Sequence, residues 1–541
     1  MEPNLPRIAA GYNGTDLVLS FLSPNGNWVE IKSNGVPLQQ EFPVPQLIRN
    51  GISANGNFKA RQGYAGIVDL RSLLSRLKTI YRVIPILSSG RNPVDFTIAL
   101  LTLRLLVEQN KDWGTWAEQD SLVIGSKSKD HAIAERILVL VDRILNDPNM
   151  KRKYGDIFNF KDSSEDSEIS FNFKNILSKI ERGREHFSDL FKAIDELPPI
   201  EHSNFDVFGE VFQWIGDEST KKALGEFFTG RHIISAIMPI LFERSGISAD
   251  KLDLYNLKIA DIACGTGGFL TEALRYIRDA YILDTEEVKN ISKSVFFGYD
   301  IGHANASRAR VNMYFAGDGF SDIRGGFDSL SEFSASEFPS GGFDFVTTNP
   351  PYGKSAYGRS EEAFLLKSVD VLKNGGWGLI VLPSGVLENP RSSDIRYRLL
   401  RSAKITDIIS LPKHAFSPYT QQKTSIIVFQ KRKSISLTEA GSWDEIGSLH
   451  GNEKISLYIV DNDGYANSDK RYPTNRTGSD GSFLHNELSH WQDKSGTKRL
   501  SHLANTLIND ILPSLTSNEF GIELDKKYEI VRVKDLLSLD R

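Results

Sequence analysis

The sequence contains almost no cysteine and no long apolar run, and these absences exclude several classes of protein. Cys264 is the single cysteine in 541 residues, which excludes a disulfide framework and a cysteine-rich zinc site. No run of about 18 apolar residues occurs, so we expect no membrane-spanning segment. Residues 1–6 lack the charged and then apolar pattern of a signal peptide. A location in the reducing cytoplasm is therefore expected.

The chain also lacks a net positive charge. Its 64 basic and 69 acidic residues give a net charge of −5, so counterion release alone would hold it weakly to nucleic acid. Any contact with nucleic acid must then come from a local patch or from a partner. Residues 151–153 and 431–433 are short basic runs and are candidate patches, although such runs are more often solvated surface.

The length predicts several domains, and the texture of the sequence changes along the chain. Residues 1–65 are expected to form a β-rich segment of unknown role, with strands at 17–22 and 28–31. Residues 66–204 have apolar side chains at helical spacing, which predicts a helical N-terminal domain. Within this domain the polar stretch 161–168 is expected to be a loop.

Residues 205–435 alternate short apolar runs with helical stretches. This alternation predicts an α/β fold with a doubly wound, mainly parallel sheet. Residues 436–541 are expected to form a C-terminal extension that binds a partner. It contains a polar loop at 465–483 and a helical stretch near 503–515.

A glycine-rich turn between a predicted strand and helix indicates a ligand site near residues 258–269. Glycine lets a backbone come close to a ligand, but the spacing is neither that of a dinucleotide motif nor that of a phosphate loop. Asp261 stands at the strand end, where it can meet a cationic ligand such as an amino-acid-bearing nucleoside with a sulfonium centre. Cys264 is interpreted as a small turn residue. The glycine-rich turn contains Gly265, Thr266, Gly267 and Gly268.

Two further acids are candidates for the same ligand. Asp300 ends an apolar strand, and an acid in that position commonly accepts hydrogen bonds from ribose hydroxyls. The alternative is an ordinary helix-capping aspartate. Asp318, between two glycines, is expected to face the adenine end of the ligand, although turns of this composition are common.

The most informative stretch is a predicted buried strand, residues 343–348, that ends in Asn349, Pro350, Pro351 and Tyr352. The amino nitrogen of adenine is a poor nucleophile because its lone pair is delocalised into the ring. The Asn349 side-chain oxygen and the Pro350 carbonyl can accept its two hydrogens and draw the nitrogen toward tetrahedral geometry. Tyr352 is expected to stack on a base flipped out of the duplex. The alternative is a proline-rich turn that only closes a strand.

Taken in order, these motifs resemble those of the amino-DNA methyltransferases, specifically the modification subunits of type I restriction–modification systems. In that family a motif before the glycine-rich turn lies at the methionine end of the cofactor, and this chain has a similar segment at 225–231. The family usually has proline where this chain has Gly230. The resemblance implies cofactor contacts from Asn349 and from this segment, namely Glu226, Phe227, Phe228, Thr229, Gly230 and Arg231.

Three later segments also resemble this family. Residues 411–425 are similar to a motif whose aromatic residue packs against the flipped base, and Phe416 is the matching position; a core phenylalanine is the alternative. Residues 459–465 and 469–471 resemble a loop typical of modification subunits. Residues 527–536 resemble the strand that opens a target-recognition domain.

The resemblance implies a Rossmann-like methyltransferase that uses S-adenosyl-L-methionine, without a metal, to methylate adenine N6 in double-stranded DNA. About 110 residues follow the catalytic region, too few for a pair of recognition domains. We therefore expect a separate specificity subunit and two copies of this chain per complex, with a restriction or translocase subunit as a further possible partner.

Two other kinds of function stay open. One is methylation of another planar nitrogen, in cytosine N4, RNA or protein glutamine. Glutamine methyltransferases share the Asn-Pro-Pro-Tyr motif but are typically shorter, and cytosine-N4 enzymes usually have serine in place of Asn349. The other is a non-catalytic scaffold of a defence complex. Retention of Asp261, Asn349 and Tyr352 argues against the scaffold.

Overall fold

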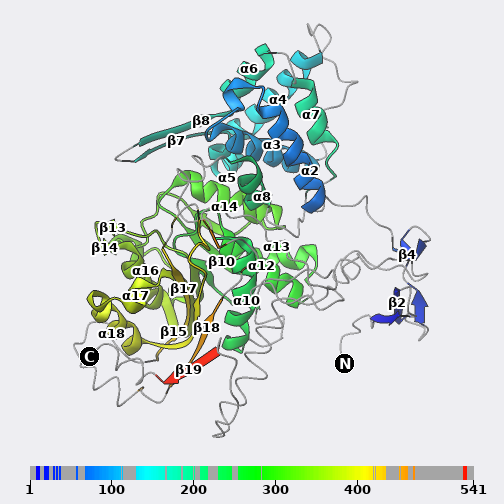
Figure 1. The fold of residues 1–541 in the computed structure, drawn as a ribbon. Helices are drawn as coiled ribbons and strands as arrows, with labels where there is room; N and C mark the ends of the chain where they lie inside the picture. The colour runs from blue at the N-terminus through cyan, green and yellow to red at the C-terminus, as the bar shows by residue number, and fades with distance from the viewer. Residues whose placement is uncertain are drawn as a thin grey trace.

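A computed structural model shows a helical region joined to a region built on one large sheet (Figure 1). Within the described part of the chain, no helix has the length and apolar character needed to cross a bilayer. The described residues are 8–12, 17–22, 28–30, 32–33, 36–37, 57–58, 67–110, 113, 129–164, 167–183, 187–198, 200, 207–216, 229–246, 254–281, 283–417, 420, 422–433, 450, 453–460, 463, 467–468 and 528–532.

Near the N-terminus the described residues form short strands, in line with the β-rich expectation. One antiparallel sheet contains β1 (Ile8–Tyr12), β2 (Leu17–Leu22) and β3 (Trp28–Glu30). A second sheet contains β4 (Lys32–Ser33), β5 (Val36–Pro37) and β6 (Asn57–Phe58). Strands β2 and β3 lie where the apolar runs predicted them.

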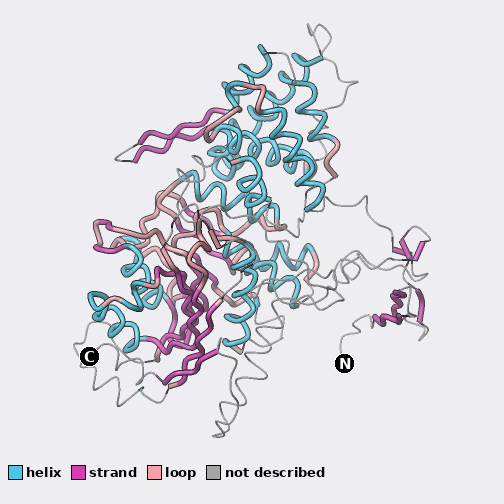
Figure 2. The backbone as a smooth tube through the Cα atoms, in the orientation of Figure 1, coloured by secondary structure: helices cyan, strands magenta, loops and turns pink. Residues whose placement is uncertain are grey.

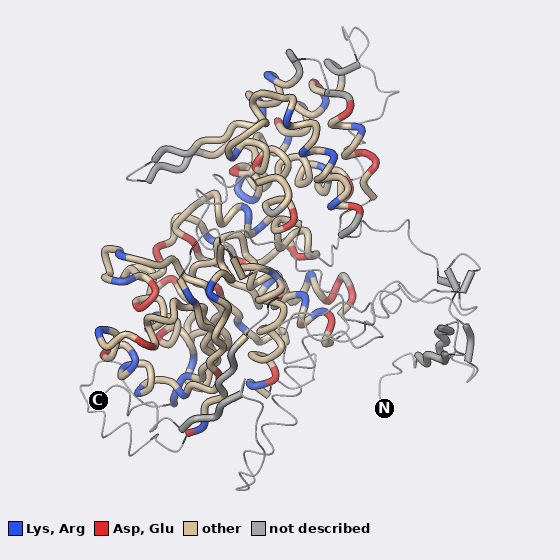
Figure 3. Tube along the Cα trace, viewed as in Figure 1, with Lys and Arg blue, Asp and Glu red and all other residues tan. Residues whose placement is uncertain are grey.

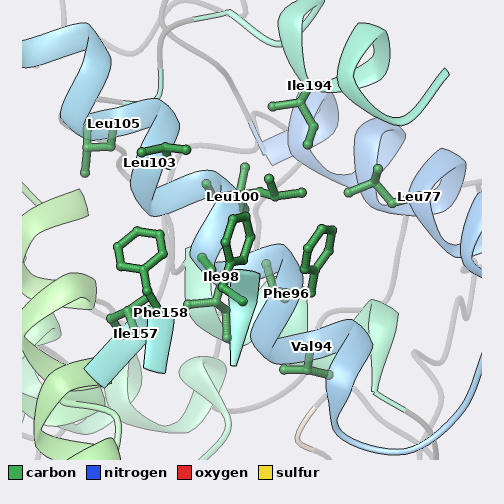
Figure 4. Close-up of a cluster of buried hydrophobic side chains, with 14 of the residues drawn as sticks. Leu77, Val94, Phe96, Ile98, Leu100, Leu103, Leu105, Ile157, Phe158 and Ile194 are labelled. Atoms are coloured by element: carbon green, nitrogen blue, oxygen red, sulfur yellow. The ribbon is translucent and has the colours of Figure 1, made fainter. Parts of the chain in front are cut away.

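The helical region packs around α3, most of whose side chains are buried. Phe96 of α3 stacks on Phe173 of α6, with ring centroids 5.0 Å apart, and Figure 4 shows this core. Helix α8 also joins this core and packs on α2 and α3, so the region extends past the predicted boundary at residue 204. Its helices are α2 (Ile67–Tyr81), η1 (Pro85–Leu87), α3 (Asn92–Gln109), α4 (Lys129–Asn146), α5 (Pro148–Phe158), α6 (Phe173–Gly183), α7 (Phe187–Asp195) and α8 (Val207–Ile215).

The polar stretch 161–168 is not a simple loop, and that expectation was wrong. Strands β7 (Asn159–Ser164) and β8 (Ser167–Asn172) form an antiparallel hairpin there. At its base the rings of Phe160 and Phe171 stack with centroids 5.8 Å apart. Cross-strand aromatic pairs of this kind stabilise a hairpin whose other residues are mostly polar, which composition alone does not reveal.

The second region contains a nine-stranded sheet in the order β11-β10-β9-β12-β15-β17-β16-β18-β19. The first five strands are parallel, and β17 runs antiparallel to both of its neighbours. After β9 the chain adds β10 and β11 on one side and then β12 and β15 on the other, so the winding reverses between β9 and β12. Ligands bind at the carboxyl ends of the strands beside such a reversal. The strands are β9 (Ile259–Asp261), β10 (Phe296–Tyr299), β11 (Asp322–Arg324), β12 (Phe343–Thr348), β15 (Leu372–Pro383), β16 (Ala403–Ser410), β17 (Thr424–Lys431), β18 (Lys454–Ile459) and β19 (Tyr528–Arg532).

Both faces of this sheet are covered by helices (Figure 2). Successive side chains of a strand point to opposite faces, so Leu379 and Ile380 of β15 belong to two different apolar clusters. This burial on both faces explains why the strands read as continuous apolar runs. One face carries α10 (Arg231–Ser245), α12 (Gly268–Ala280), α13 (Thr285–Ser292) and α14 (His303–Phe315), and the other carries α16 (Ser360–Val371) and α18 (Ser393–Ser402).

Helix α14 joins the two regions because its apolar side chains enter both cores. Arg308 donates to Asp95 of α3 at 2.8 Å, and Ser307 donates to Asp156 of α5 at 2.8 Å. Acidic and basic positions are interspersed over the described parts of both regions (Figure 3).

The large sheet, with its parallel strands and its helices on both faces, confirms the α/β expectation.

Strand β19 contains the described residues of the segment 527–536. It pairs antiparallel with β18 and forms the edge of the large sheet, with Tyr528 opposite Tyr458. The described part of this segment is therefore an edge strand of the sheet. Of the predicted loop at 465–483 only residues 467–468 are described, and the helical stretch near 503–515 lies outside the described residues.

Candidate active site

The glycine-rich turn after β9 is shaped by close contact with α14. Gly265 and Gly267 have φ of 50° and 77°, a conformation that favours glycine. A Cβ on Gly267 would lie 3.0 Å from the Cβ of Ala309. The Asn312 side chain donates to the Thr266 carbonyl at 3.1 Å. The turn is therefore fixed by its neighbours and leads directly into α12.

The segment before α10 reaches this turn from the other side. The Arg231 guanidinium donates to the Gly268 carbonyl and lies 3.2 Å from the Glu272 carboxylate. Gly230 has φ of −54°, which proline also adopts, but a Cβ there would lie 2.4 Å from the His232 ring. His232 thus fills the space that the family's usual proline would need.

Only part of this predicted methionine-end segment is described. Thr229 is buried beside the catalytic loop, and Gly230 and Arg231 lie as given above. Glu226, Phe227 and Phe228 lie outside the described residues.

Asp261 and Asp300 meet at the carboxyl ends of β9 and β10. Asp300 accepts hydrogen bonds from the backbone N–H groups of Gly265, at 2.9 Å, and Gly302, at 2.8 Å. It therefore ties the glycine-rich turn to the start of α14. Asp261 accepts from the Ala263 N–H at 3.1 Å and is 1% exposed.

Burial raises the pKa values of Asp261 and Cys264. It raises the pKa of Asp261 to about 7; the Thr348 side chain and the Ala263 N–H lower that pKa, and the nearby Asp300 charge raises it further. Burial and the two carboxylates also raise the pKa of the Cys264 thiol well above its usual value. Cys264 therefore stays a neutral thiol, as a small turn residue should. Nowhere in the described residues do three or more His, Cys, Asp or Glu side chains gather as metal ligands would.

The catalytic loop follows β12, every residue of which is buried. The Tyr352 hydroxyl donates to Asn349 Oδ1 at 2.8 Å, and Asn349 Nδ2 donates to Thr229 Oγ1 at 2.9 Å. Pro350, which lies between Asn349 and Tyr352 in the sequence, is buried. The structure thus brings together Asn349 and Thr229, two of the residues for which the resemblance implies cofactor contacts. Burial and the Glu361 charge raise the pKa of Tyr352, so its hydroxyl keeps the proton that it donates.

The expectation for Asp318 is wrong on topological grounds. Asp318 precedes β11, which runs parallel to β10, so it lies at the amino-terminal edge of the sheet. Asp261, Asp300 and Asn349 all lie at the opposite, carboxyl-terminal edge. The carboxylate of Asp318 accepts instead from the backbone N–H groups of Phe320, at 2.7 Å, and Ser321, at 3.2 Å.

Asp328, unlike Asp318, lies at the carboxyl-terminal edge of the sheet, as Asp261 and Asp300 do. It follows the carboxyl end of β11, beside Phe327, whose N–H donates to the Asp300 carbonyl at 3.0 Å. The next residue, Ser329, donates to the Ile262 carbonyl at 2.7 Å. In the sequence, Asp328 could have been identified because it comes four residues after a short strand with an apolar residue at its centre. The glycines on both sides of Asp318 made that residue the more conspicuous candidate.

Phe416 does not face open space. It is 2% exposed and lies in the apolar cluster on the α10–α14 face of the sheet. The structure therefore supports the core alternative rather than a ring presented to a base. Nearby, the His414 N–H donates to the side chain of Asn467 at 3.1 Å, and His232 lies 3.4 Å from the buried Asp463. Two residues that follow β18, Asp463 and Asn467, thus contact the start of α10 and the segment after β16.

The two basic runs have structural contacts. Lys431 donates to the carbonyls of Asp370 and Leu372, and Arg432 forms a two-bonded ion pair with Glu453 at 2.6 and 2.7 Å. Lys153 donates to the Gly319 carbonyl at 3.1 Å. Lys431 and Arg432 therefore stabilise the end of β17, and Lys153 links α5 to the segment before β11.

Comparison with known proteins agrees with this geometry. Residues 203–446 match the family described as N-6 DNA Methylase. The Type I restriction enzyme EcoEI methylase subunit of Escherichia coli is 26% identical over 260 residues, which cover 45% of this chain and 50% of that protein. The StySPI methylase subunit of Salmonella potsdam is 26% identical over 290 residues, covering 48% and 51%.

The chain spans about half the length of these curated relatives. A solved structure from a study of a type I R-M system covers 87% of this chain and 89% of its own, with a TM-score of 0.53 and 19% identity, and it supports the fold. Residues 203–446 thus match the N-6 DNA methylase family, and over about half of its length the chain is similar to the methylase subunits of type I restriction enzymes.

Proposed function

We propose that this chain transfers a methyl group from S-adenosyl-L-methionine to N6 of an adenine flipped out of double-stranded DNA. The observation that carries the proposal is the placement of Asn349. Its amide lies at the carboxyl end of β12, next to the winding reversal, and is held by Thr229 and Tyr352. The glycine-rich turn and two carboxylates lie at the neighbouring strand ends.

The residues at β9 and β10 fit this cofactor. The bent glycine-rich turn lets a ligand approach the backbone closely, and the buried Asp261 carboxylate suits the positive charge of the cofactor's amino acid end. Asp300 suits the ribose hydroxyls, because its carboxylate lies beside the turn at 2.9 Å from the Gly265 nitrogen. Asp328, at the end of β11, replaces Asp318 as the candidate for the adenine end.

The chain's own residues would prepare the adenine amino group. When bound, the cofactor supplies an electrophilic methyl group on a sulfonium centre. Asn349 Oδ1 and the Pro350 carbonyl accept the two amino hydrogens, which localises the lone pair on N6 and aims it at the methyl carbon. A nitrogen–carbon bond then forms as the carbon–sulfur bond breaks, and the methylated nitrogen loses one proton to solvent.

Tyr352 must move for this reaction. In the structure its hydroxyl donates to Asn349 Oδ1, the atom that receives an amino hydrogen in the proposed reaction. Entry of the target base would exchange this hydroxyl for the amino group and leave the tyrosine ring free to stack on the base. Stacking of a base on an aromatic side chain contributes about 1–3 kcal/mol.

The other candidate functions are less well supported. Asn349, rather than serine, disfavours the cytosine-N4 reaction, and the match to an N-6 DNA methylase family disfavours RNA and protein glutamine. A scaffold would need none of the hydrogen bonds that orient Asn349. Those bonds, to Thr229 and Tyr352, are present.

The partners follow from the relatives, which are named as methylase subunits of restriction enzymes. We propose that this chain likewise acts in the cytoplasm as a modification subunit, in two copies, with a separate specificity subunit that reads the DNA sequence. A restriction or translocase subunit is a further proposed partner. In the run 431–433, Lys431 and Arg432 are engaged in contacts within the chain, which supports the proposal that another protein reads the bases.

The test is transfer of tritium from labelled cofactor to DNA by the full chain, with and without the protein encoded beside it. We expect transfer that depends on a specific site and on the second protein. The Asn349→Ala variant should bind labelled cofactor yet transfer methyl groups roughly 10²–10³-fold more slowly. Site-specific transfer by the chain alone would refute the separate specificity subunit, and absence of transfer in every combination would refute the activity.

A further inference from the structure

Glu361 is a completely buried carboxylate that no part of the proposed chemistry uses. It lies in the first turn of α16, and its side chain is 0% exposed. One oxygen, Oε2, accepts from the backbone N–H of Gly353 at 2.8 Å. The other, Oε1, accepts from Arg359 Nε at 2.8 Å. A buried charge needs such partners, and here one partner is the backbone of the catalytic loop.

Gly353 is the residue directly after Tyr352. Its N–H is bound by Glu361, and its carbonyl accepts from the Ser360 N–H at 2.8 Å, so both backbone groups are held by the start of α16. Its φ of 110° is a conformation that favours glycine. The chain between Gly353 and Ser360 is thus a closed loop. It contains the short hairpin of β13 (Lys354–Ser355) and β14 (Gly358–Arg359).

This closed loop also contacts the far side of the site. Tyr357 lies between the hairpin strands, and its hydroxyl donates to Asp328 Oδ2 at 2.5 Å. The loop therefore links the end of β11 to the catalytic residues after β12. From Glu361 the contacts run through Gly353 and its neighbour Tyr352 to Asn349 at 2.8 Å.

From this geometry we propose that Glu361 is a positioning residue for methyl transfer, which holds the backbone of the loop that carries Asn349 and Tyr352 through the Gly353 N–H. The inference rests on the proposed function. Glu361 touches neither DNA nor cofactor in this proposal. Its loss should therefore slow the transfer step and leave cofactor affinity unchanged, because the cofactor turn is held by Asp300 and Arg231 instead.

The test compares Glu361→Ala and Glu361→Gln in the full chain with its genomic partner. Single-turnover methyl transfer at saturating cofactor should fall roughly 10²-fold in Glu361→Ala, the cost of misplacing a reacting group by about 1 Å. Glutamine keeps an acceptor for Gly353 but not the charge, so Glu361→Gln should lose about tenfold. The dissociation constant for cofactor should stay within about threefold in both.

Glu362 provides the matched control. It is the next residue of the same helix turn, yet its carboxylate accepts from Ser392 at 2.7 Å and lies 3.7 Å from Arg359. Glu362→Gln removes the same charge near the same helix end and should transfer methyl groups at the wild-type rate. An equal loss in Glu362→Gln and Glu361→Gln would assign the effect to charge alone and overturn the positioning role.

Combination with Tyr352→Phe identifies the route of the effect. If Glu361 acts through the catalytic loop, the losses in Glu361→Gln and Tyr352→Phe will be less than multiplicative. Multiplicative losses, or a wild-type rate in Glu361→Gln, would refute the inference even if Glu361→Ala fails to fold. A wild-type chain that transfers no methyl group would instead refute the proposed function.

Discussion

The two halves of the site are held in different ways. In the cofactor half, Asp300 is fixed by backbone N–H groups of Gly265 and Gly302. In the catalytic half, Asn349 is fixed by the side chains of Thr229 and Tyr352. Backbone donors survive most substitutions, whereas a side-chain donor is lost with its residue. The catalytic half should therefore be broken by single substitutions that leave cofactor binding intact.

The largest effect is expected from Asn349→Ala. Loss of a preorganised polar group that acts in the transition state reduces rates by roughly 10²–10³-fold. Single-turnover transfer should fall by this amount, and cofactor affinity measured by calorimetry should change little. A parallel loss of affinity would show that the two halves are not separable.

Asp300→Ala tests the cofactor half. It removes the charged acceptor of two backbone N–H groups and should weaken cofactor binding by roughly 10- to 100-fold, since a hydrogen bond to a charged group contributes about 1.5–3 kcal/mol. The melting temperature should also fall, because the turn loses its tie to α14. Asp300→Asn, which keeps one acceptor, is the control, and its cofactor affinity should lie between those of the wild type and Asp300→Ala. Unchanged affinity in Asp300→Ala would remove Asp300 from the site.

The pH dependence of cofactor binding tests Asp261. Its pKa is raised to about 7 by burial and by the Asp300 charge, and the ionised form is the one suited to a cationic ligand. Affinity should thus fall about tenfold per pH unit below 7, as expected for one linked proton. Calorimetry in two buffers with different ionisation enthalpies should detect proton release on binding. A flat profile from pH 5 to 7 would contradict this role.

The same shift has a consequence for stability without cofactor. Because the folded-state pKa is above the ordinary 3.8, Asp261 contributes stability that is complete below about pH 4. That contribution is lost as the pH rises toward 7. Asp261→Asn should remove this loss, so the variant should gain thermal stability over the wild type as the pH rises through this window.

The smallest effect is expected at Asp318. Asp318→Asn changes a carboxylate at the wrong edge of the sheet and should leave cofactor affinity within about twofold. Asp328→Asn, at the carboxyl edge, should weaken it by about tenfold, the value of one hydrogen bond to a charged group. Reversed results would restore the original assignment of Asp318.

The sequence predicted the strand ends at which three candidate residues lie, because these strands are strongly apolar. Strands β9, β10 and β12 are largely buried, and Asp261, Asp300 and Asn349 lie at their carboxyl ends, so the apolar runs were enough to locate these residues. Strand β11 has only three residues, one of them buried, and its short signal did not show on which side the acid should lie. That ambiguity produced the error at Asp318.

Other features depend on tertiary contacts that no local pattern contains. Phe416 has the motif position of a base-contacting ring, yet it is buried in an apolar cluster that also contains Ile409 of β16 and Ile426 of β17. Arg432 belongs to a basic run, but its partner Glu453 is 21 residues away in sequence. No local sequence pattern pointed to Glu361, because its proposed positioning role depends on its contact with the backbone N–H of Gly353.

The central claim is that the loop after β12 methylates the amino group of adenine. The most direct measurement is mass spectrometry of nucleosides from DNA treated with the full chain, its genomic partner and deuterated-methyl cofactor. We predict label in N6-methyladenine alone, formed roughly 10²–10³-fold more slowly by the Asn349→Ala variant. Label in methylated cytosine or in protein glutamine, or label in adenine that forms at an undiminished rate without Asn349, would contradict the account.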